Sequence, residues 1–408
     1  MKILFSHYAI LDQEGFGRTF MLARELALLG HSVTFLTSQH SNINHYLFHK
    51  ENRENVSIYS FPDIVPNSFR RTGFGIFNFV FKLFFIVFTN YDIYFSDNGH
   101  RLSGGIPILI RKIFFRTIYI SEWWDYFGKN GQFEKKKGLK KISHGFYDLF
   151  FEEFEKKRAE GIVCLSAAMF ERAKNLNVKK QSICIIHGGA DVRAIKFYSA
   201  PINQLKQNES AELILGFVGL NLGELNDILP LIMALNEITK DKSIPYPITL
   251  LSTGKILPKE VTDQLNIRFN FVQMGWTDYR NYPELLAMFD IAVLTQEENL
   301  LNLYRWPNKI GDYLAAGRKI LINSYGETSL FVSEFQKVFI EVNFDIDSIK
   351  NKIIEVYNSK FYKQDRFEIR RIACENFSWQ LRAKELEDFI YEVIQKNKRT
   401  HSRRKLTE

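Results

Sequence analysis

The stretch KILFSHYAILDQEGFGRTFMLARELALLGHSVTFLT, residues 2–37, decides the fold class. Its two ends, Lys2–Phe5 and Val33–Thr37, are short apolar runs typical of buried strands, and three leucines between them recur at helical spacing. Gly30 then stands where a helix C-cap glycine belongs. A strand, a helix and a strand in this order form a βαβ unit, which predicts a parallel sheet with covered faces.

The same alternation of strands and helices continues to the end of the chain. A polar segment without periodicity, residues 198–210, separates two such series and is the best candidate for a linker. We therefore expect an α/β protein with two Rossmann-like parallel-sheet domains that face a central cleft. The first comprises residues 1–197 and is completed by a C-terminal helix, residues 380–408, and the second comprises residues 211–379.

The composition bounds the class of protein. The 408 residues are 46% hydrophobic and 25% charged, which excludes a disordered, collagen-like or disulfide-stapled chain. The net charge of +8 suits a surface that meets phosphates or acidic lipid, and it does not require nucleic acid. The three cysteines are far apart, so they indicate neither a disulfide framework nor a metal site.

Two segments bear on location. Phe74–Phe88 is the most apolar segment; we expect it to be a buried helix, because it falls short of the length that a bilayer crossing needs. Lys135–Lys141 holds five lysines close to several phenylalanines. This run fits either a solvated helix face or a site for an anionic membrane surface. Since no secretory signal opens the chain, we expect a cytoplasmic protein, with peripheral contact to the inner face of a membrane left open.

The most informative motif is RWPNKIGDYLAAG, residues 305–317. A proline suits the first turn of a helix, and Asn308 and Lys309 would lie in that turn, with Asp312 one turn later on a similar face. A diphosphate there would meet backbone N–H groups and the charges of Arg305 and Lys309. Asp312 could then accept hydrogen bonds from ribose hydroxyls. The alternative is an ordinary helix with solvated charges.

A second anion site is expected near the N-terminus. Gly15 and Gly17 open a helix after the first strand, but Phe20 fills the third place of a G-x-G-x-x-G fingerprint. No acid ends the second strand, so NAD binding is disfavoured. What remains is a helix N-terminus at Gly17 that could bind an anion, or a glycine pair used only for a turn.

Taken together, these motifs resemble the GT-B-fold glycosyltransferases, and most of all the large retaining group called glycosyltransferase family four. The resemblance spans nearly the whole chain, and its segments occur in the family's order: residues 14–18 with 26–34, 185–191, 215–219, 282–290, 307–317 and 377–379. It implies an acceptor-binding first domain, a second domain that binds a nucleotide-sugar donor, and a last helix that crosses back to the first domain. It also implies retention of anomeric configuration.

The chain departs from the family at the donor phosphates. The family usually carries an Arg and a Lys just after the glycine that corresponds to Gly219, but residues 220–227 contain no base. We expect Arg305 and Lys309, with Lys255, to replace them, since their charge would neutralise a diphosphate. The other interpretation is weak or absent catalysis.

The family's pair of glutamates is altered as well. Asp312 stands at the second glutamate, and Tyr304 occupies the place eight residues earlier. Glu297 and Glu298 are nearby but out of register.

Candidate catalytic residues follow two strands of the first domain. Asp97 and His100 lie in a loop after a strand end, near the place where related enzymes have a histidine. Either could contact the donor sugar or an acceptor hydroxyl. Glu122 and Asp125 flank two tryptophans that could stack on a sugar face. A strand-end loop with buried tryptophans is an equally good interpretation.

The expected function is hexosyl or related glycosyl transfer from a nucleotide-diphosphate sugar to a glycan or lipid-linked hydroxyl, in surface polysaccharide biosynthesis. The alternatives are a nucleotide-sugar epimerase on the same fold and a non-catalytic sugar-nucleotide binder. We expect no cofactor, no metal and no nucleic acid. Asp345-Ile-Asp347 matches the D-x-D metal motif of another fold, but it is better explained as the cap of a helix.

Overall fold

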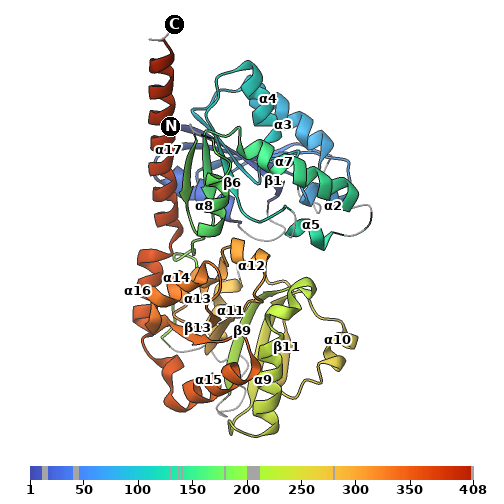
Figure 1. Cartoon of the computed structure of the whole chain (residues 1–408), viewed down its shortest axis with the longest axis vertical. Coiled ribbons are helices and arrows are strands. Elements are labelled where there is room, and N and C mark those ends of the chain that lie inside the picture. Colours follow the sequence, from blue (N-terminus) through green and yellow to red (C-terminus); the bar gives the residue numbers. More distant parts are fainter. Residues whose placement is uncertain are drawn as a thin grey trace. The chain divides into compact units, whose positions relative to one another are not determined.

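The protein forms two compact units, here described from a computed structural model (Figure 1). The structure describes residues 1–11, 17–39, 46–128, 131–136, 138, 141–178, 181–199, 212–278 and 281–405; side chains at 135, 142, 143 and 400–405 are outside this description. Unit 1 comprises Met1–Gly188, Tyr304–Trp306 and Trp379–Glu408, and unit 2 comprises Gly189–Leu303 and Pro307–Ser378. Most of the expected linker, the glycine loop before Gly17 and part of the lysine run lie outside the described residues.

Unit 1 is built on an eight-stranded sheet with the order β3-β4-β2-β1-β5-β6-β7-β8. Its strands are β1 (Lys2–Ile10), β2 (Ser32–Ser38), β3 (His49–Arg53), β4 (Val56–Phe61), β5 (Ile93–Asp97), β6 (Tyr119–Trp123), β7 (Gly161–Cys164) and β8 (Ser182–Ile185). All neighbours are parallel except β3 and β4, which pair antiparallel. The apolar runs that predicted β1 and β2 lie at its centre, where Ile3, Leu4 and Phe5 are fully buried.

Helices cover both faces of this sheet. They are α1 (Arg18–Leu28), α2 (Asn67–Arg71), α3 (Ile76–Phe88), α4 (Ile106–Phe114), α5 (Gln132–Lys135), α7 (Phe146–Lys156), α8 (Ala167–Lys174) and α17 (Trp379–Lys405), with a π-helical turn at Lys141–Gly145. α3 packs against α4 (Figure 1), and α17 returns to pack against α1. The chain crosses the sheet in one direction from β1 to β2, and in the other from β4 through β5 to β6. Right-handed crossovers therefore place the pair α1 and α17 on one face of the sheet and the pair α3 and α4 on the opposite face.

The expectation that Phe74–Phe88 forms a buried helix is wrong in one respect. The helix exists as α3, but its buried positions are Asn78, Lys82 and Ile86, and most of its phenylalanines face outward. The apolar character of the segment suggested burial all round, whereas tertiary contacts bury its polar positions. Among the described residues, no helix combines the length and the apolar character needed to span a bilayer.

Unit 2 is built on a six-stranded parallel sheet with the order β11-β10-β9-β12-β13-β14. Its strands are β9 (Leu213–Leu220), β10 (Ile248–Gly254), β11 (Asn270–Gln273), β12 (Ile291–Leu294), β13 (Lys319–Asn323) and β14 (Phe339–Val342). Its helices are α9 (Leu229–Lys240), α10 (Lys259–Gln264), α11 (Tyr282–Met288), α12 (Leu300–Tyr304), α13 (Lys309–Ala315), α14 (Thr328–Glu334), α15 (Ile346–Ser359) and α16 (Arg366–Asn376). A 3₁₀ helix, η2 (Leu222–Asp227), follows β9. The parallel α/β architecture predicted for both halves is confirmed.

The D-x-D segment caps a helix, as expected. The Asp345 carboxylate accepts a hydrogen bond from the backbone N–H of Ser348 at 2.7 Å, at the start of α15. This oxygen satisfies one of the free N–H groups in the helix's first turn.

We expect Gly216→Ala to destabilise unit 2. Gly216 lies in the middle of β9, and a Cβ atom added there would overlap the ring of Phe289, which is fully buried. The substitution should lower the free energy of unfolding by about 1–3 kcal/mol, as overpacking in cores does. Gly223→Ala, where a Cβ meets only open space, is the matched control. Equal urea midpoints for the two variants, measured by circular dichroism, would contradict this packing.

Candidate functional site

Unit 1 has a pocket of about 230 Å³ at the carboxyl end of β1. Gly17, at the start of α1, borders it. Its polar and aromatic lining consists of His7, Tyr8, Thr19, Arg71 and Trp124. Ligands of parallel α/β sheets bind at this end of the strands, so this pocket is the candidate site of unit 1.

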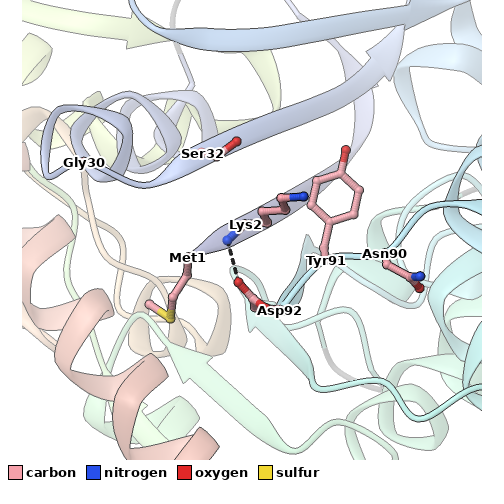
Figure 2. A pocket seen from close by; sticks show the side chains of 7 residues that line it. All are labelled: Met1, Lys2, Gly30, Ser32, Asn90, Tyr91 and Asp92. Atoms are coloured by element: carbon pink, nitrogen blue, oxygen red, sulfur yellow. Dashed lines mark hydrogen bonds between the residues drawn. The ribbon is translucent and has the colours of Figure 1, made fainter.

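A second hollow of about 530 Å³ lies at the opposite, amino ends of the strands (Figure 2). Met1, Lys2, Asn90, Tyr91 and Asp92 are among its lining residues, and the backbone N–H of Lys2 donates to Asp92 at 2.7 Å. The fold gives no reason to expect chemistry at this end of a parallel sheet.

The first pocket is organised by Asp97, which is fully buried at the end of β5. Its carboxylate accepts hydrogen bonds from His7 Nδ1, from the Thr19 hydroxyl at 2.7 Å and from the backbone N–H of Tyr8 at 3.1 Å. Asp97 therefore lies beneath the pocket, and His7 forms part of its surface.

This arrangement selects one form of the His7 ring. A carboxylate can only accept hydrogen bonds, so Nδ1 of His7 carries a proton, and Nε2 is the ring nitrogen that can accept a bond from a ligand. The sequence reasoning missed His7. The available signal was the change from apolar to polar residues at Ser6 and His7, where β1 meets its carboxyl end.

His100 lies away from the pocket. Its side chain is fully buried, with Nε2 3.4 Å from a carboxylate oxygen of Asp148 and the ring centre 4.7 Å from that of Phe127. Burial lowers the pKa of His100 to about 3, although Asp148 opposes this shift. These contacts put His100 in the interior of unit 1 and do not bring it together with Asp97 and His7.

The residues around the tryptophan pair divide between core and pocket. Glu122 is fully buried and accepts hydrogen bonds from Arg18 Nε at 2.7 Å and from the Trp124 indole. Burial raises the pKa of Glu122, and Arg18 opposes the shift. Trp123 is buried, whereas Trp124 lines the pocket, so only one tryptophan of the pair can meet a sugar there. Asp125 is half-buried just beyond them.

In unit 2, the candidate donor residues gather at the carboxyl end of β9. Lys309, the first residue of α13, donates from Nζ to the carbonyl of Val218 at 2.8 Å and lies 4.1 Å from the centre of the Phe217 ring. The Tyr313 hydroxyl accepts from the N–H of Val218 at 2.9 Å, so α13 is fixed to the strand by two hydrogen bonds. This geometry holds the amine of Lys309 near the carboxyl end of β9.

Gly219 and Lys255 lie at the same edge. Gly219 has a φ of 77°, and a Cβ atom built there would meet nothing within 4 Å, so open space faces this backbone. The backbone N–H of Lys255 donates to the carbonyl of Leu220 at 2.7 Å, which sets the exposed Lys255 beside the end of β9. Asn308 is exposed at the start of α13, and Arg305 is a half-buried residue of unit 1.

The carboxyl group of Asp312 has a raised pKa. Burial, and to a smaller extent the nearby Asp191 carboxylate, raises the pKa of Asp312 to about 7. The Tyr282 hydroxyl donates to Asp312 at 3.1 Å and works against this shift. Near neutral pH, this side chain can therefore both donate and accept hydrogen bonds.

A polar cluster that the motifs did not predict lies beyond β12. The Asp227 carboxylate accepts from the N–H of Glu297 at 2.8 Å and from the Asn302 amide at 3.0 Å. Asn226 donates to the carboxylate of Glu297 at 3.2 Å, which ties η2 to the segment before α12. Spacing placed Glu297 out of register, but these contacts put it at the strand ends of unit 2.

Tyr304, at the place of the family's first glutamate, belongs to unit 1. Its ring stacks on that of Tyr126 at 4.7 Å, and its carbonyl accepts from the Ser166 hydroxyl at 2.7 Å. Within the described residues, no cluster of three or more His, Cys, Asp and Glu side chains could hold a metal ion.

Comparison with known proteins bears on the fold. No family model matches the chain. It is 23% identical, over 221 residues, to the putative teichuronic acid biosynthesis glycosyltransferase TuaH of Bacillus subtilis. The aligned region is 53% of each protein, so the chain matches about half the length of this relative.

The solved structures are similar over almost the whole chain. Sucrose-phosphate synthase from Thermosynechococcus elongatus superimposes with a TM-score of 0.72 over 97% of this chain and 99% of its own, at 14% identity. The chain has the GT-B fold.

Two further GT-B structures agree. The lipopolysaccharide-biosynthesis glycosyltransferase WaaG gives a TM-score of 0.64 at 13% identity, covering 96% of this chain and 99% of its own. Anabaena HepE, in complex with UDP-glucose, gives 0.63 at 14% identity, covering 96% and 100%. The likeness that the motifs suggested is confirmed at the level of the GT-B fold.

We expect the stability of unit 2 to depend on pH through Asp312. The folded protein keeps the Asp312 proton up to about pH 7, because its pKa is raised, whereas the unfolded chain loses it at about pH 4. The free energy of unfolding therefore falls as pH rises through this window, because the native state binds the extra proton.

Asp312→Asn should remove this dependence. Between about pH 5 and pH 8, the free energy of unfolding of the variant should rise by about 1–3 kcal/mol relative to that of wild type. Urea titrations at the two pH values measure both. Asp347→Asn, an exposed position in the first turn of α15, is the control. Parallel pH profiles for wild type and Asp312→Asn would refute the raised pKa.

Proposed function

We propose that this protein is a glycosyltransferase that moves a sugar from a nucleotide-diphosphate sugar to a hydroxyl group of a glycan or lipid-linked acceptor, in surface polysaccharide biosynthesis. The observation that carries the proposal is Lys309, an amine fixed at the carboxyl end of β9 beside the open backbone of Gly219. The GT-B fold supports it, as do the roles of similar proteins in teichuronic acid and lipopolysaccharide biosynthesis.

In this proposal, unit 2 binds the donor. Lys309 and Lys255 neutralise the diphosphate, and the backbone at Gly219 and Asn308 approaches it closely. The role expected of Arg305, a residue of unit 1, stays a prediction. Asp312 holds ribose hydroxyls. HepE binds UDP-glucose and UDP, which supports a nucleoside diphosphate sugar as the donor class.

The reaction breaks the bond between the anomeric carbon and the diphosphate oxygen, and the acceptor oxygen forms the new bond. The nucleoside diphosphate leaves with the bonding electron pair. Cations fixed beside it stabilise the negative charge that develops in the transition state. The acceptor hydroxyl loses its proton, and the residues near that hydroxyl decide where the proton goes.

Unit 1 binds the acceptor in this scheme, with His7 as the residue closest to the chemistry. Asp97 holds the ring, and Nε2 accepts a hydrogen bond from a substrate hydroxyl. Trp124 offers an aromatic face to a sugar, and Glu122 fixes the indole of Trp124. Asp125 borders this group. His100, in the segment after Asp97, is buried against Asp148 in the interior of unit 1 and does not line this pocket.

The family resemblance favours retention of anomeric configuration and a reaction without a metal, and both belong to the proposal. With retention, His7 would only orient a substrate hydroxyl. It would not act as a base on the face of the sugar opposite the leaving group. A base acting on that opposite face would give inversion. The anomeric configuration of the product, read by NMR, distinguishes the two roles. We also place the reaction at the inner face of a membrane.

The donor site is tested by Lys309→Ala. Uridine diphosphate should raise the Tm of the wild-type protein, because a ligand that binds only the native form stabilises it. The affinity of Lys309→Ala for it should fall at least about tenfold, since a charge-assisted contact to phosphate is lost. Lys352→Ala, on α15, is the matched control. Unchanged affinity in Lys309→Ala would remove Lys309 from the donor site.

The acceptor side is tested by His7→Ala. Its kcat for sugar transfer should fall by about 10²–10⁴ if the ring takes the proton, and by less if it only orients a hydroxyl. Asp97→Asn should lower kcat too, because the ring would lose its fixed tautomer. His49→Ala replaces an exposed histidine of β3 and should keep wild-type activity. A kcat for His7→Ala equal to that of this control would exclude His7 from the reaction.

One observation favours a second candidate, a non-catalytic nucleotide-sugar binder. Residues 220–227 carry no base where related enzymes hold the donor phosphates. Wild-type binding of the nucleotide without transfer to any acceptor would favour this candidate. Release of an epimer from donor alone would instead indicate an epimerase.

A further inference from the structure

Helix α3 has its polar and apolar faces reversed relative to an ordinary surface helix. A helix that covers a sheet normally buries its apolar stripe and exposes its polar residues. In α3, Asn78 and Lys82 are fully buried, while Phe84 and Phe88 are 58% and 77% exposed.

The buried polar residues explain why this orientation is fixed. The Asn78 amide donates to the carbonyls of Thr37 and Phe61 at 3.1 and 3.3 Å, at the ends of β2 and β4. Leaving a buried polar group without such a partner costs free energy, so α3 cannot turn its phenylalanines inward without losing these bonds.

Lys82 adds a second anchor. Its Nζ donates to the carbonyl of His7 at 2.5 Å and to that of Ser103 at 2.9 Å. A buried amine that loses its hydrogen-bond partners costs free energy. Lys82 therefore also holds α3 in this orientation.

The exposed apolar surface continues onto α4, which packs against α3 (Figure 1). Ile113 and Phe114, at the end of α4, are 74% and 71% exposed. We call the combined surface the outer aromatic face; it comprises Phe77, Phe81, Phe84 and Phe88 of α3 with Ile113 and Phe114 of α4. Contiguous apolar surface of this kind marks an interaction site on a folded protein.

The charge around this face selects the partner. No Asp or Glu occurs in residues 64–91 or 98–121, the segments that contain α3 and α4. Arg116 is exposed just after α4, and Arg71 is exposed just before α3, where it also lines the pocket of unit 1. Lys112, in the last turn of α4, is ion-paired with Glu160 at 2.7 Å, so its charge is already balanced. A cationic rim around aromatic side chains matches the surface of a bilayer that contains anionic lipid.

We propose that the outer aromatic face docks onto the surface of an anionic phospholipid bilayer. The 13 residues of α3 span about 20 Å, less than the hydrocarbon core, so the helix lies in the plane of the interface. Its phenylalanines enter the boundary between headgroups and acyl chains, and the basic rim meets lipid phosphates.

This proposal does not rest on glycosyl transfer, but it bears on the acceptor. Because Lys82 is bonded to the carbonyl of His7, docking brings the pocket of unit 1 to about one helix diameter from the lipid, roughly 10 Å. A lipid-linked glycan could then reach the pocket without leaving the bilayer. The surface differs from the lysine run Lys135–Lys141, which the sequence alone suggested.

The test is co-sedimentation of the full chain with vesicles, without nucleotide sugar or acceptor. Wild type should bind phosphatidylcholine vesicles that contain about one third phosphatidylglycerol, and bind less as salt rises. Phe84→Ser with Phe114→Ser should lower the partition coefficient at least about tenfold, because two phenylalanines no longer enter the interface. Arg116→Ala should lower it about fivefold on anionic vesicles and leave binding to pure phosphatidylcholine unchanged.

The matched control is Phe367→Ser with Leu330→Ser. These residues of unit 2 are 71% and 55% exposed, close to the values for Phe114 and Phe84. Equal vesicle binding by the two double variants would overturn the proposal. So would a concentration-dependent dimer in sedimentation analysis that only the Phe84/Phe114 variant loses, because the face would then bind a second copy.

The uridine diphosphate thermal shift separates this result from the transfer proposal. The Phe84/Phe114 variant should keep the wild-type shift, which also shows that it is folded. If the Phe84/Phe114 variant loses vesicle binding but keeps the wild-type thermal shift, the result supports docking. If the wild-type protein binds vesicles but transfers no sugar, the transfer proposal fails and the docking proposal is unaffected.

Discussion

Backbone carbonyls at the carboxyl ends of buried parallel strands need hydrogen-bond donors, and much of unit 1 is arranged to supply them. Asn78 and Lys82 serve β2, β4 and β1, and Arg18 donates to the carbonyls of Ile186 and His187 beyond β8. Because unsatisfied buried carbonyls are costly, these long polar side chains must point inward. Because Asn78 and Lys82 must face inward to make these hydrogen bonds, the phenylalanines of α3 face outward.

The two units meet this demand in a similar way at their first strands. In unit 1, Lys82 donates to the carbonyl of His7 at the end of β1, and in unit 2, Lys309 donates to the carbonyl of Val218 at the end of β9. The difference is burial. Lys82 is fully enclosed, and burial lowers its pKa to about 7, whereas Lys309 is only half-buried. An enclosed amine serves structure, while a half-buried one can also serve a ligand.

The sequence predicted most elements and part of the candidate site. The apolar runs of β1 and β2, a helix whose first turn is near Lys309 and the cap at Asp345 follow from local spacing, and the structure has all of them. His7 could not be selected in the same way, since its importance comes from Asp97, which is 90 residues away. His100 is close to Asp97 in the chain, but its ring turns into the core against Asp148, and no local rule sets that direction.

The sequence by itself determined the alternation of strands and helices, because hydrophobic periodicity and capping residues act over a few positions. It also determined which polar residues exist to act at the strand ends. Only the tertiary structure decided which of them meet: the contact of Asp97 with His7, the raised pKa of Asp312 beside Asp191, and the outward turn of the α3 phenylalanines. The physical reason is that hydrogen bonding and burial depend on neighbours that are distant in the chain, and these neighbours come together only when parallel strands line up their carboxyl ends.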